Sequence, residues 1–333
     1  MNLRVGLLGG GSWGTTVASL TAHNVPTTLW ARRQETVDEI NSQHTNGRYL
    51  PNCTLHEALE ASASIEETVN SADVVVMGIP AQAFRKVLIA AKPHIRPWVP
   101  IVSLSKGLEK GTQMRMTQII EEVMPGHPAG VLTGPNLARE ILAGQAAASV
   151  IAMVDDTIAN SLKKVFRTGL FRVYTNDDVV GCELGGALKN VVALAAGMGD
   201  GAGAGVNTRS AIITRGLAEL TRLGVAMGGR PETFAGLAGM GDLVATCTSP
   251  LSRNFSVGFQ LGKGRQLDEI IEEMSMVAEG VKSVSVVMDL ASKYSVDMPI
   301  ANEIYKVIHE GNTVSDAFRG LIQKESGAEA EPG

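Results

Sequence analysis

Lys189 is the residue of this chain best suited to acid–base chemistry. It lies in an apolar segment, directly after Gly185-Gly186-Ala187-Leu188. If the segment is helical, the lysine leans over the preceding turn, where two glycines leave room for a ligand or another backbone. Desolvation would lower its pKa toward the range of a general acid or base. The alternative is a lysine whose stem covers a tight helix–helix contact.

Asp242 is a candidate partner for this lysine. It follows Gly239-Met240-Gly241 in a second, mostly apolar segment, where a carboxylate without a cation is costly. We therefore predict that Asp242 pairs with Lys189. The segment is not a dinucleotide-binding turn, because it has neither a third glycine nor a preceding strand.

A candidate anion site follows at Ser249-Pro250-Leu251-Ser252-Arg253-Asn254. This pattern is typical of a helix start, with Ser249 at the N-cap and Pro250 at the first helical position. Backbone N–H groups there, together with Ser252, Arg253 and Asn254, would suit a phosphate. An ordinary capped surface helix is the alternative.

The beginning of the chain has the pattern of a dinucleotide-binding turn. An apolar run of strand length ends at Leu8, and glycines follow at positions 9, 11 and 14, before a helix-like segment. Gly9 would make the tight turn, Gly11 would let a pyrophosphate approach the backbone, and Gly14 would let helix and strand pack closely. The helix start would hold the phosphate charge. Glycine-rich turns are common, so a purely structural turn is the alternative.

Two arginines, Arg32 and Arg33, follow the second expected strand, Thr27 to Trp30. NAD-preferring enzymes usually offer an acidic side chain to the ribose at this position, whereas NADP sites offer arginine. A guanidinium can make charge-assisted contacts with a 2′-phosphate. The sequence therefore predicts that NADP(H) is preferred and that NAD(H) is possible. A solvated arginine pair is the alternative.

Further strands place more candidates at the same edge of the sheet. The apolar run Pro100 to Leu104 leads into Lys106, and Gly130 to Thr133 leads into Gly134-Pro135-Asn136. Because parallel strands end at one edge, Lys106 is expected to contact substrate or nicotinamide; a surface lysine is the alternative. Tyr49 could pack near the adenine or serve as an ordinary core residue.

The composition excludes several classes of protein. A length of 333 residues with 44% hydrophobic and 19% charged residues indicates a soluble, two-domain protein. A net charge of −5 argues against nucleic-acid binding. The three cysteines and six histidines have no metal-ligand spacing, so no metal is expected. No run of 18 uncharged apolar residues and no signal sequence is evident, which predicts a cytoplasmic protein that is not inserted in a membrane.

The order of the segments predicts the fold. Strand and helix patterns alternate to about residue 175, which indicates an N-terminal α/β domain with a doubly wound parallel sheet, Rossmann-like, over residues 1–180. Residues 34–72 are predicted to be helix and loop. From residue 181 apolar residues recur at helical spacing, so residues 181–323 are predicted to form an all-α domain. Gly197 to Gly205 is expected to be a flexible or closely packed loop, and residues 324–333 a disordered tail.

Together these segments resemble the NAD(P)-dependent glycerol-3-phosphate dehydrogenase family, in its bacterial soluble type. The resemblance covers nearly the whole chain and is most specific in two blocks. It rests on the Gly9-to-Gly14 turn, Ser105-Lys106-Gly107, Gly134-Pro135, Gly186-Ala187-Leu188-Lys189-Asn190, Gly236 to Asp242, and Ser252-Arg253-Asn254.

The resemblance implies reversible reduction of dihydroxyacetone phosphate to sn-glycerol 3-phosphate for glycerophospholipid synthesis, by a homodimer. Lys189 would be the proton donor. The implied substrate contacts are Lys106, Gly134, Asn136, Asp242, Ser252, Arg253 and Asn254. The implied cofactor contacts beyond the glycines are Ser12, Trp13, Arg32, Arg33, Lys106, Ala138, Arg253, Val277 and Glu279; Tyr49 is a further candidate from the residues alone. The sequence departs from the family at Asn136-Leu137, where Ser or Thr followed by Phe is common; Asn136 can still donate a hydrogen bond.

Two other functions remain open on the residues alone. One is a two-domain dehydrogenase acting on a 3-hydroxy acid or a phosphorylated sugar acid, which would need a group for a carboxylate. The other is a non-catalytic NADP(H)-sensing protein, in which Lys189 would be freely replaceable.

Overall fold

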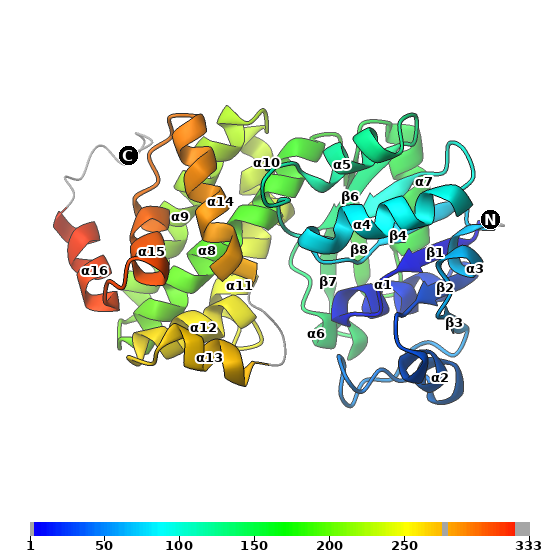
Figure 1. Cartoon of the computed structure of the whole chain (residues 1–333), viewed down its shortest axis with the longest axis horizontal. Helices are drawn as coiled ribbons and strands as arrows, with labels where there is room; N and C mark the ends of the chain where they lie inside the picture. The colour runs from blue at the N-terminus through cyan, green and yellow to red at the C-terminus, as the bar shows by residue number, and fades with distance from the viewer. Residues whose placement is uncertain (1–2, 275–278, 324–333) are drawn as a thin grey trace. The chain divides into compact units, whose positions relative to one another are not determined.

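The computed structural model describes residues 3–274 and 279–323 (Figure 1). The chain divides into two compact units, Met1–Glu183 and Leu184–Gly333. The predicted tail, residues 324–333, lies outside the described residues.

The first unit is built on an eight-stranded sheet in the order β3-β2-β1-β4-β5-β6-β7-β8. All neighbouring strands are parallel except β6 and β7, which pair antiparallel. The strand order reverses between β1 and β4, and ligands of such sheets bind outside the carboxyl ends of the strands at that point. The strands are β1 (Val5–Leu8), β2 (Thr27–Trp30), β3 (Leu59–Ser62), β4 (Val74–Met77), β5 (Ile101–Ser103), β6 (Ala129–Thr133), β7 (Ala147–Met153) and β8 (Phe171–Asn176).

The central strands β1 and β4 are buried on both faces of the sheet. Along β1 and β4, Leu7 and Val76 enter one hydrophobic core, whereas Leu8, Val75 and Met77 enter a second one. A strand buried on both faces has no polar face, which explains the continuous apolar runs in the sequence. The helices of the unit are α1 (Ser12–Ala22), α2 (Gln34–Gln43), α3 (Ile65–Val69), α4 (Ala81–Ala91), the 3₁₀ turn η1 (Lys92–His94), α5 (Met116–Val123), α6 (Ala138–Leu142) and α7 (Asp156–Phe166).

The predicted α/β class is confirmed, with two differences in the sheet. The segment 34–72, predicted as helix and loop, contains the edge strand β3, Leu59–Ser62. Only Leu59 and Ala61 of this strand are buried, and it has no β-branched residue, so its signal in the sequence is weak. The sheet is also not wholly parallel, because β7 runs opposite to β6.

The long helix α8 (Val179–Gly201) begins in the first unit and continues into the second. Its buried Glu183 accepts hydrogen bonds from the Thr117 amide at 2.9 Å and the Thr117 hydroxyl at 2.5 Å, and pairs with Arg115 at 2.5 Å. Burial raises the pKa of Glu183, and both partners oppose that rise. By length and composition α8 could cross a membrane, but 94% of its apolar window is buried within the protein, as in the core helix of a soluble protein.

The second unit is helical throughout its described residues (Figure 1). The segment Gly197 to Gly205, expected to be a loop, is helical as far as Gly201. A Cβ atom on Gly197 or Gly201 would overlap a carbonyl oxygen of Phe255 or Phe259, so these glycines let two helix backbones touch. The remaining elements are α9 (Val206–Ala226), α10 (Pro231–Ala235), the π-helical turn η2 (Leu237–Gly241), α11 (Asp242–Thr248), α12 (Arg253–Gly262), α13 (Leu267–Glu273), α14 (Glu279–Lys293), α15 (Pro299–His309) and α16 (Val314–Gln323).

Candidate active site

The glycine turn joins β1 to α1 at the point where the strand order reverses. Gly9 has a φ of +126°, which side chains rarely adopt, and a Cβ there would overlap the carbonyl oxygen of Gly78, just after β4. A Cβ on Gly14 would overlap the carbonyl oxygen of Gly9. A Cβ on Gly11 would meet nothing within 4 Å. Two glycines therefore close the turn, and the third faces open space at the first residues of α1.

One of the two residues beside this turn, Trp13, has a polar group with no partner among the described residues. The Ser12 hydroxyl donates to the Tyr49 carbonyl at 3.0 Å. Trp13 packs edge-on against Phe171, and its buried Nε1 has no hydrogen-bond partner among the described residues. An open backbone at a helix start beside an unsatisfied donor fits the pyrophosphate of a dinucleotide.

Arg32 and Arg33 are exposed directly after β2, and Arg33 is the N-cap residue of α2. Gly9 donates its amide to the carbonyl of Trp30, the last residue of β2, at 3.1 Å. The two arginines thus follow the strand that ends next to the glycine turn.

Lys106 and Gly134 come together at the ends of β5 and β6. The Lys106 ammonium donates to the Gly134 carbonyl at 2.9 Å. Asn136 accepts a hydrogen bond from Ser149 at 2.5 Å, while its buried Nδ2 has no partner in the described part of the chain. Ala138 begins α6. The strand ends therefore carry a cation and an amide donor that could contact a small polar substrate.

Lys189 and Asp242 form a buried pair in the second unit, as predicted from their apolar surroundings. The Lys189 ammonium lies 2.5 Å from an Asp242 carboxylate oxygen, and only 5% of Lys189 and 2% of Asp242 are exposed. A buried pair of this kind is costly to break, because either charge alone would lie uncompensated. On the same helix as Lys189, a Cβ on Gly185 would lie 2.5 Å from the Ala238 carbonyl oxygen, so this glycine admits another backbone.

Thr246 is a further contact of this lysine, and the sequence analysis did not identify it. Its hydroxyl donates to the Asp242 carbonyl at 2.6 Å and accepts from the Lys189 ammonium at 2.5 Å. It lies four residues after Asp242 on α11, so both point to one side of the helix. That spacing was the available signal. The neighbouring Cys247 is buried, which raises the pKa of its thiol to about 12 and keeps it protonated.

The candidate anion site begins later than the sequence predicts. Helix α12 starts at Arg253 with Ser252 as its N-cap, and the Ser252 hydroxyl accepts from the Phe255 amide at 3.3 Å. Ser249, predicted as the N-cap, instead ends α11, and Pro250 lies in the turn between the helices. Ser252 is the N-cap residue because its hydroxyl accepts a hydrogen bond from the amide of the third residue of the helix.

Asn254 ties the start of α12 to the helix that carries Lys189. Its Nδ2 donates to the side chain of Asn190 at 2.9 Å, and its Oδ1 accepts from the Gly280 amide at 2.9 Å. Arg253 is exposed at the same helix start. Glu279 is the first residue of α14 and precedes Gly280 directly. Val277, the other predicted cofactor contact of this segment, lies outside the described residues.

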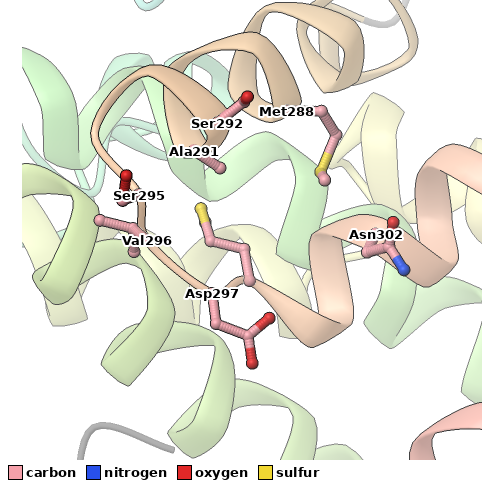
Figure 2. Close-up of a pocket in the computed structure, with 8 residues that line it drawn as sticks. Met288, Ala291, Ser292, Ser295, Val296, Asp297 and Asn302 are labelled. Atoms are coloured by element: carbon pink, nitrogen blue, oxygen red, sulfur yellow. The ribbon is translucent and has the colours of Figure 1, made fainter.

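A separate cavity of about 450 Å³ lies at the junction of α14 and α15 (Figure 2). None of the predicted site residues lines it, so we do not assign it to the reaction. Its lining residues are Met288, Ala291, Ser292, Ser295, Val296, Asp297, Met298 and Asn302.

The fold and the glycine turn define the class of the protein, a dinucleotide-binding protein with a Rossmann-like unit and a helical unit. Residues 4–159 match the family model for the N-terminus of NAD-dependent glycerol-3-phosphate dehydrogenase, and residues 178–319 match the model for its C-terminus. The chain belongs to this family.

Known glycerol-3-phosphate dehydrogenases align with this chain over almost its full length. A glycerol-3-phosphate dehydrogenase [NAD(P)+] of Sphingopyxis alaskensis is 62% identical over 100% of both chains. One from Mycobacterium tuberculosis is 58% identical over 98% of this chain and 96% of the other. The crystal structure of glycerol-3-phosphate dehydrogenase from Coxiella burnetii superposes with a TM-score of 0.91 at 35% identity, covering 97% of this chain and 99% of that one.

Proposed function

We propose that this chain reduces dihydroxyacetone phosphate to sn-glycerol 3-phosphate with NAD(P)H, reversibly, and that Lys189 supplies the proton. The observation that carries this proposal is the buried ammonium of Lys189, fixed by Asp242 and Thr246. A cation held in this way is already positioned to stabilise the negative charge that develops in the transition state. Such electrostatic stabilisation is usually the largest single contribution to the rate enhancement of an enzyme.

The chemistry of the lysine follows from its contacts. In the reduction, the ketone carbon would receive a hydride from a bound nicotinamide. Negative charge then grows on the ketone oxygen, and the ammonium of Lys189 donates a proton to it. Asp242 and Thr246 hold the Lys189 ammonium in place through their contacts with Nζ. In the reverse reaction the neutral amine of Lys189 accepts the alcohol proton.

The phosphate of the substrate is proposed to bind at the first turn of α12. Arg253 offers a guanidinium there, and the helix start favours an anion. The bonds of Asn254 to Asn190 and Gly280 link this turn to the residue after Lys189. Holding the phosphate would orient the ketone toward Lys189. Lys106, Gly134 and Asn136 are proposed as further substrate contacts.

The cofactor is proposed to bind the first unit, and the second unit is proposed to carry the substrate and acid–base groups. Gly9, Gly11, Gly14, Ser12 and Trp13 would hold the pyrophosphate side, with Tyr49 and Ala138 nearby. Arg32 and Arg33 would contact a 2′-phosphate, so NADP(H) is proposed as the preferred cofactor. Lys106, Arg253 and Glu279 are the remaining proposed cofactor contacts.

The biological setting is part of the same proposal. We expect a cytoplasmic homodimer that supplies glycerol 3-phosphate for glycerophospholipid synthesis. The burial of α8 within the protein supports a chain that is not inserted in a membrane.

The substrate is tested by following NADPH oxidation with dihydroxyacetone phosphate and with a panel of 2-keto and 3-keto acids. The proposal expects turnover of dihydroxyacetone phosphate well above that of any keto acid. Preference for a keto acid would favour a hydroxy-acid dehydrogenase. NADPH binding with no turnover of any substrate would favour a sensor protein.

The role of the lysine is tested with Lys189→Ala. We expect kcat for dihydroxyacetone phosphate to fall at least ~10²-fold, the usual scale for a positioned acid–base group, while NADPH still binds. Lys263→Ala removes an exposed lysine of the same unit and serves as the control. A near-wild-type kcat in Lys189→Ala would show that another group supplies the proton.

A further inference from the structure

The segment that joins α2 to β3 runs along α1 and contacts it at three points. Asn46 donates its side-chain amide to the Thr15 hydroxyl at 2.9 Å. The Tyr49 carbonyl accepts from Ser12, and the His56 amide donates to the Ser19 hydroxyl at 2.9 Å. Residues 12, 15 and 19 lie on one face of a helix because they are three and four positions apart. This loop, residues 44–56, therefore packs along the first turns of α1.

Asn46 also reaches the glycine turn itself. Its Nδ2 donates to the Gly10 carbonyl at 3.0 Å, and no part of Asn46 is exposed. A carbonyl oxygen can only accept, so the nitrogen of the amide and not its oxygen must face Gly10. The backbone carbonyl of Asn46 accepts from the amides of Tyr49 and Leu50 at 3.1 and 2.8 Å, which fixes its position in the loop.

The bond to Gly10 sets the direction of the next amide. The peptide group between Gly10 and Gly11 is trans and planar, so the Gly11 N–H points opposite to the Gly10 carbonyl. The carbonyl is held toward the buried Asn46, whereas a Cβ on Gly11 would meet only open space. Both residues are glycines, whose backbone rotates more freely than that of any other residue. Without Asn46 this peptide group could turn over.

We propose that Asn46 is a positioning residue for the cofactor, a role that rests on the proposed dinucleotide binding. By holding the Gly10 carbonyl, Asn46 aims the Gly11 N–H at the place of the pyrophosphate. Because Asn46 is fully buried, we expect it to act through Gly10 and not by direct contact with cofactor or substrate. Its loss should therefore weaken ligands that carry the pyrophosphate and spare those that do not.

The test compares two ligands by isothermal titration calorimetry with the full chain. NADPH carries the pyrophosphate, and adenosine 2′-monophosphate has no phosphate at the 5′ position. In Asn46→Ala we expect the affinity for NADPH to fall about 10-fold, the scale of one lost hydrogen bond in a buried network. The affinity for adenosine 2′-monophosphate should change less than about 2-fold. The KM for NADPH should rise with kcat nearly unchanged.

Asn41→Ala is the matched control. Asn41, like Asn46, makes two side-chain hydrogen bonds; it donates to the Ala61 carbonyl at 2.9 Å and accepts from the Ala61 amide at 2.7 Å. Those bonds join α2 to β3 and do not involve the glycine turn. NADPH affinity should stay near that of the wild type in this variant.

The isosteric variant Asn46→Asp provides a second test of the same proposal if Asn46→Ala does not fold. Its carboxylate would place an acceptor against the Gly10 carbonyl, so NADPH affinity at pH 8 should fall at least as far, again with adenosine 2′-monophosphate spared. Equal losses for both ligands, no loss for either, or failure of both variants to fold would overturn the positioning role. Failure of the wild type to bind NADPH would instead overturn the proposed function.

Discussion

At the scale of single residues, the proposed chemistry depends on one buried cation and on two exposed ones. Lys189 is paired with Asp242 and Thr246 inside the second unit. Arg32 and Arg33 are exposed at the end of β2. The contacts of the buried lysine fix the position of its ammonium group. The exposed arginines, in contrast, can change their side-chain conformation to contact a ligand. Substitutions around Lys189 should therefore affect turnover, and substitutions of Arg32 and Arg33 should affect which cofactor binds.

We expect Thr246→Val to lower kcat about 10-fold with little change in the KM for either substrate. Valine keeps the shape of threonine but removes the oxygen that accepts from the ammonium, a bond to a charged group worth about 1.5–3 kcal/mol. Steady-state kinetics would measure the effect. The control is Thr248→Val, because the Thr248 hydroxyl bonds only to the backbone of Val244, at 2.8 Å, among the contacts of the described residues. Equal losses in both variants would mean that the helix and not the lysine is affected.

Replacing Arg32 and Arg33 together by alanine should weaken NADPH far more than NADH. A guanidinium contact with the 2′-phosphate exists only in NADPH, so on the order of 10-fold or more should be lost for that cofactor alone. Binding of both cofactors by calorimetry would measure this difference. Equal losses for NADPH and NADH would contradict a 2′-phosphate contact.

At the scale of elements, side chains that satisfy helix ends connect neighbouring segments. Ser252 caps α12, and Glu183 from α8 accepts the Thr117 amide in the first turn of α5. In the second unit, Glu219 of α9 accepts from the amides of Ile300 and Ala301 at the start of α15, at 2.6 and 3.2 Å. These carboxylates fix helix starts, at the cost of being buried.

Glu219 should make the stability of the second unit depend on pH. Burial raises its pKa to about 7, and the like charge of Asp297 adds to this, while the two amides and Arg222 oppose it. The folded chain therefore holds this proton more tightly than the unfolded chain. Its contribution is fully present below about pH 4.5 and is lost as the pH rises toward 7, by about 3 kcal/mol in all.

Urea unfolding at pH 5 and pH 8 would measure this loss. Glu219→Gln cannot titrate, so between the two pH values its free energy of unfolding should fall about 2–3 kcal/mol less than that of the wild type. Glu272→Gln, which replaces an exposed carboxyl of α13, should keep the wild-type difference. An identical pH dependence in Glu219→Gln and the wild type would show that Glu219 does not titrate in this range.

At the scale of the whole molecule, the chain combines a dinucleotide-binding unit with a helical unit that carries the lysine. Its family relatives match it over almost their full length. Both units are therefore expected to be needed for turnover, since the proposed cofactor contacts and the proposed proton donor are divided between them.

The proposed homodimer has a direct test in solution. Light scattering after size exclusion should give a mass near 70 kDa, twice the 35.0 kDa of one chain. The mass should be unchanged over a range of loading concentrations around the micromolar level if the interface is stable. A constant mass of one chain would rule out the dimer.

Several features of the fold and of the candidate site could be predicted from local patterns in the sequence. Gly9 and Gly14 could be identified because a turn with positive φ and close packing needs residues without a side chain. The buried strands and α8 could be identified because apolar periodicity depends only on neighbouring residues. The pairing of Lys189 with Asp242 was predictable because two charges in apolar surroundings must compensate each other.

Other features depended on contacts between distant segments. The edge strand β3, the antiparallel β7 and the helical Gly197–Gly201 stretch are stabilised by neighbours that local patterns do not reveal. The bond from Asn46 to Gly10 spans 36 residues, and that from Lys189 to Thr246 spans 57. Whether such polar side chains meet is decided by how the elements pack. The residue types therefore determined which chemistry is available, and the tertiary structure decided which groups hold it in place.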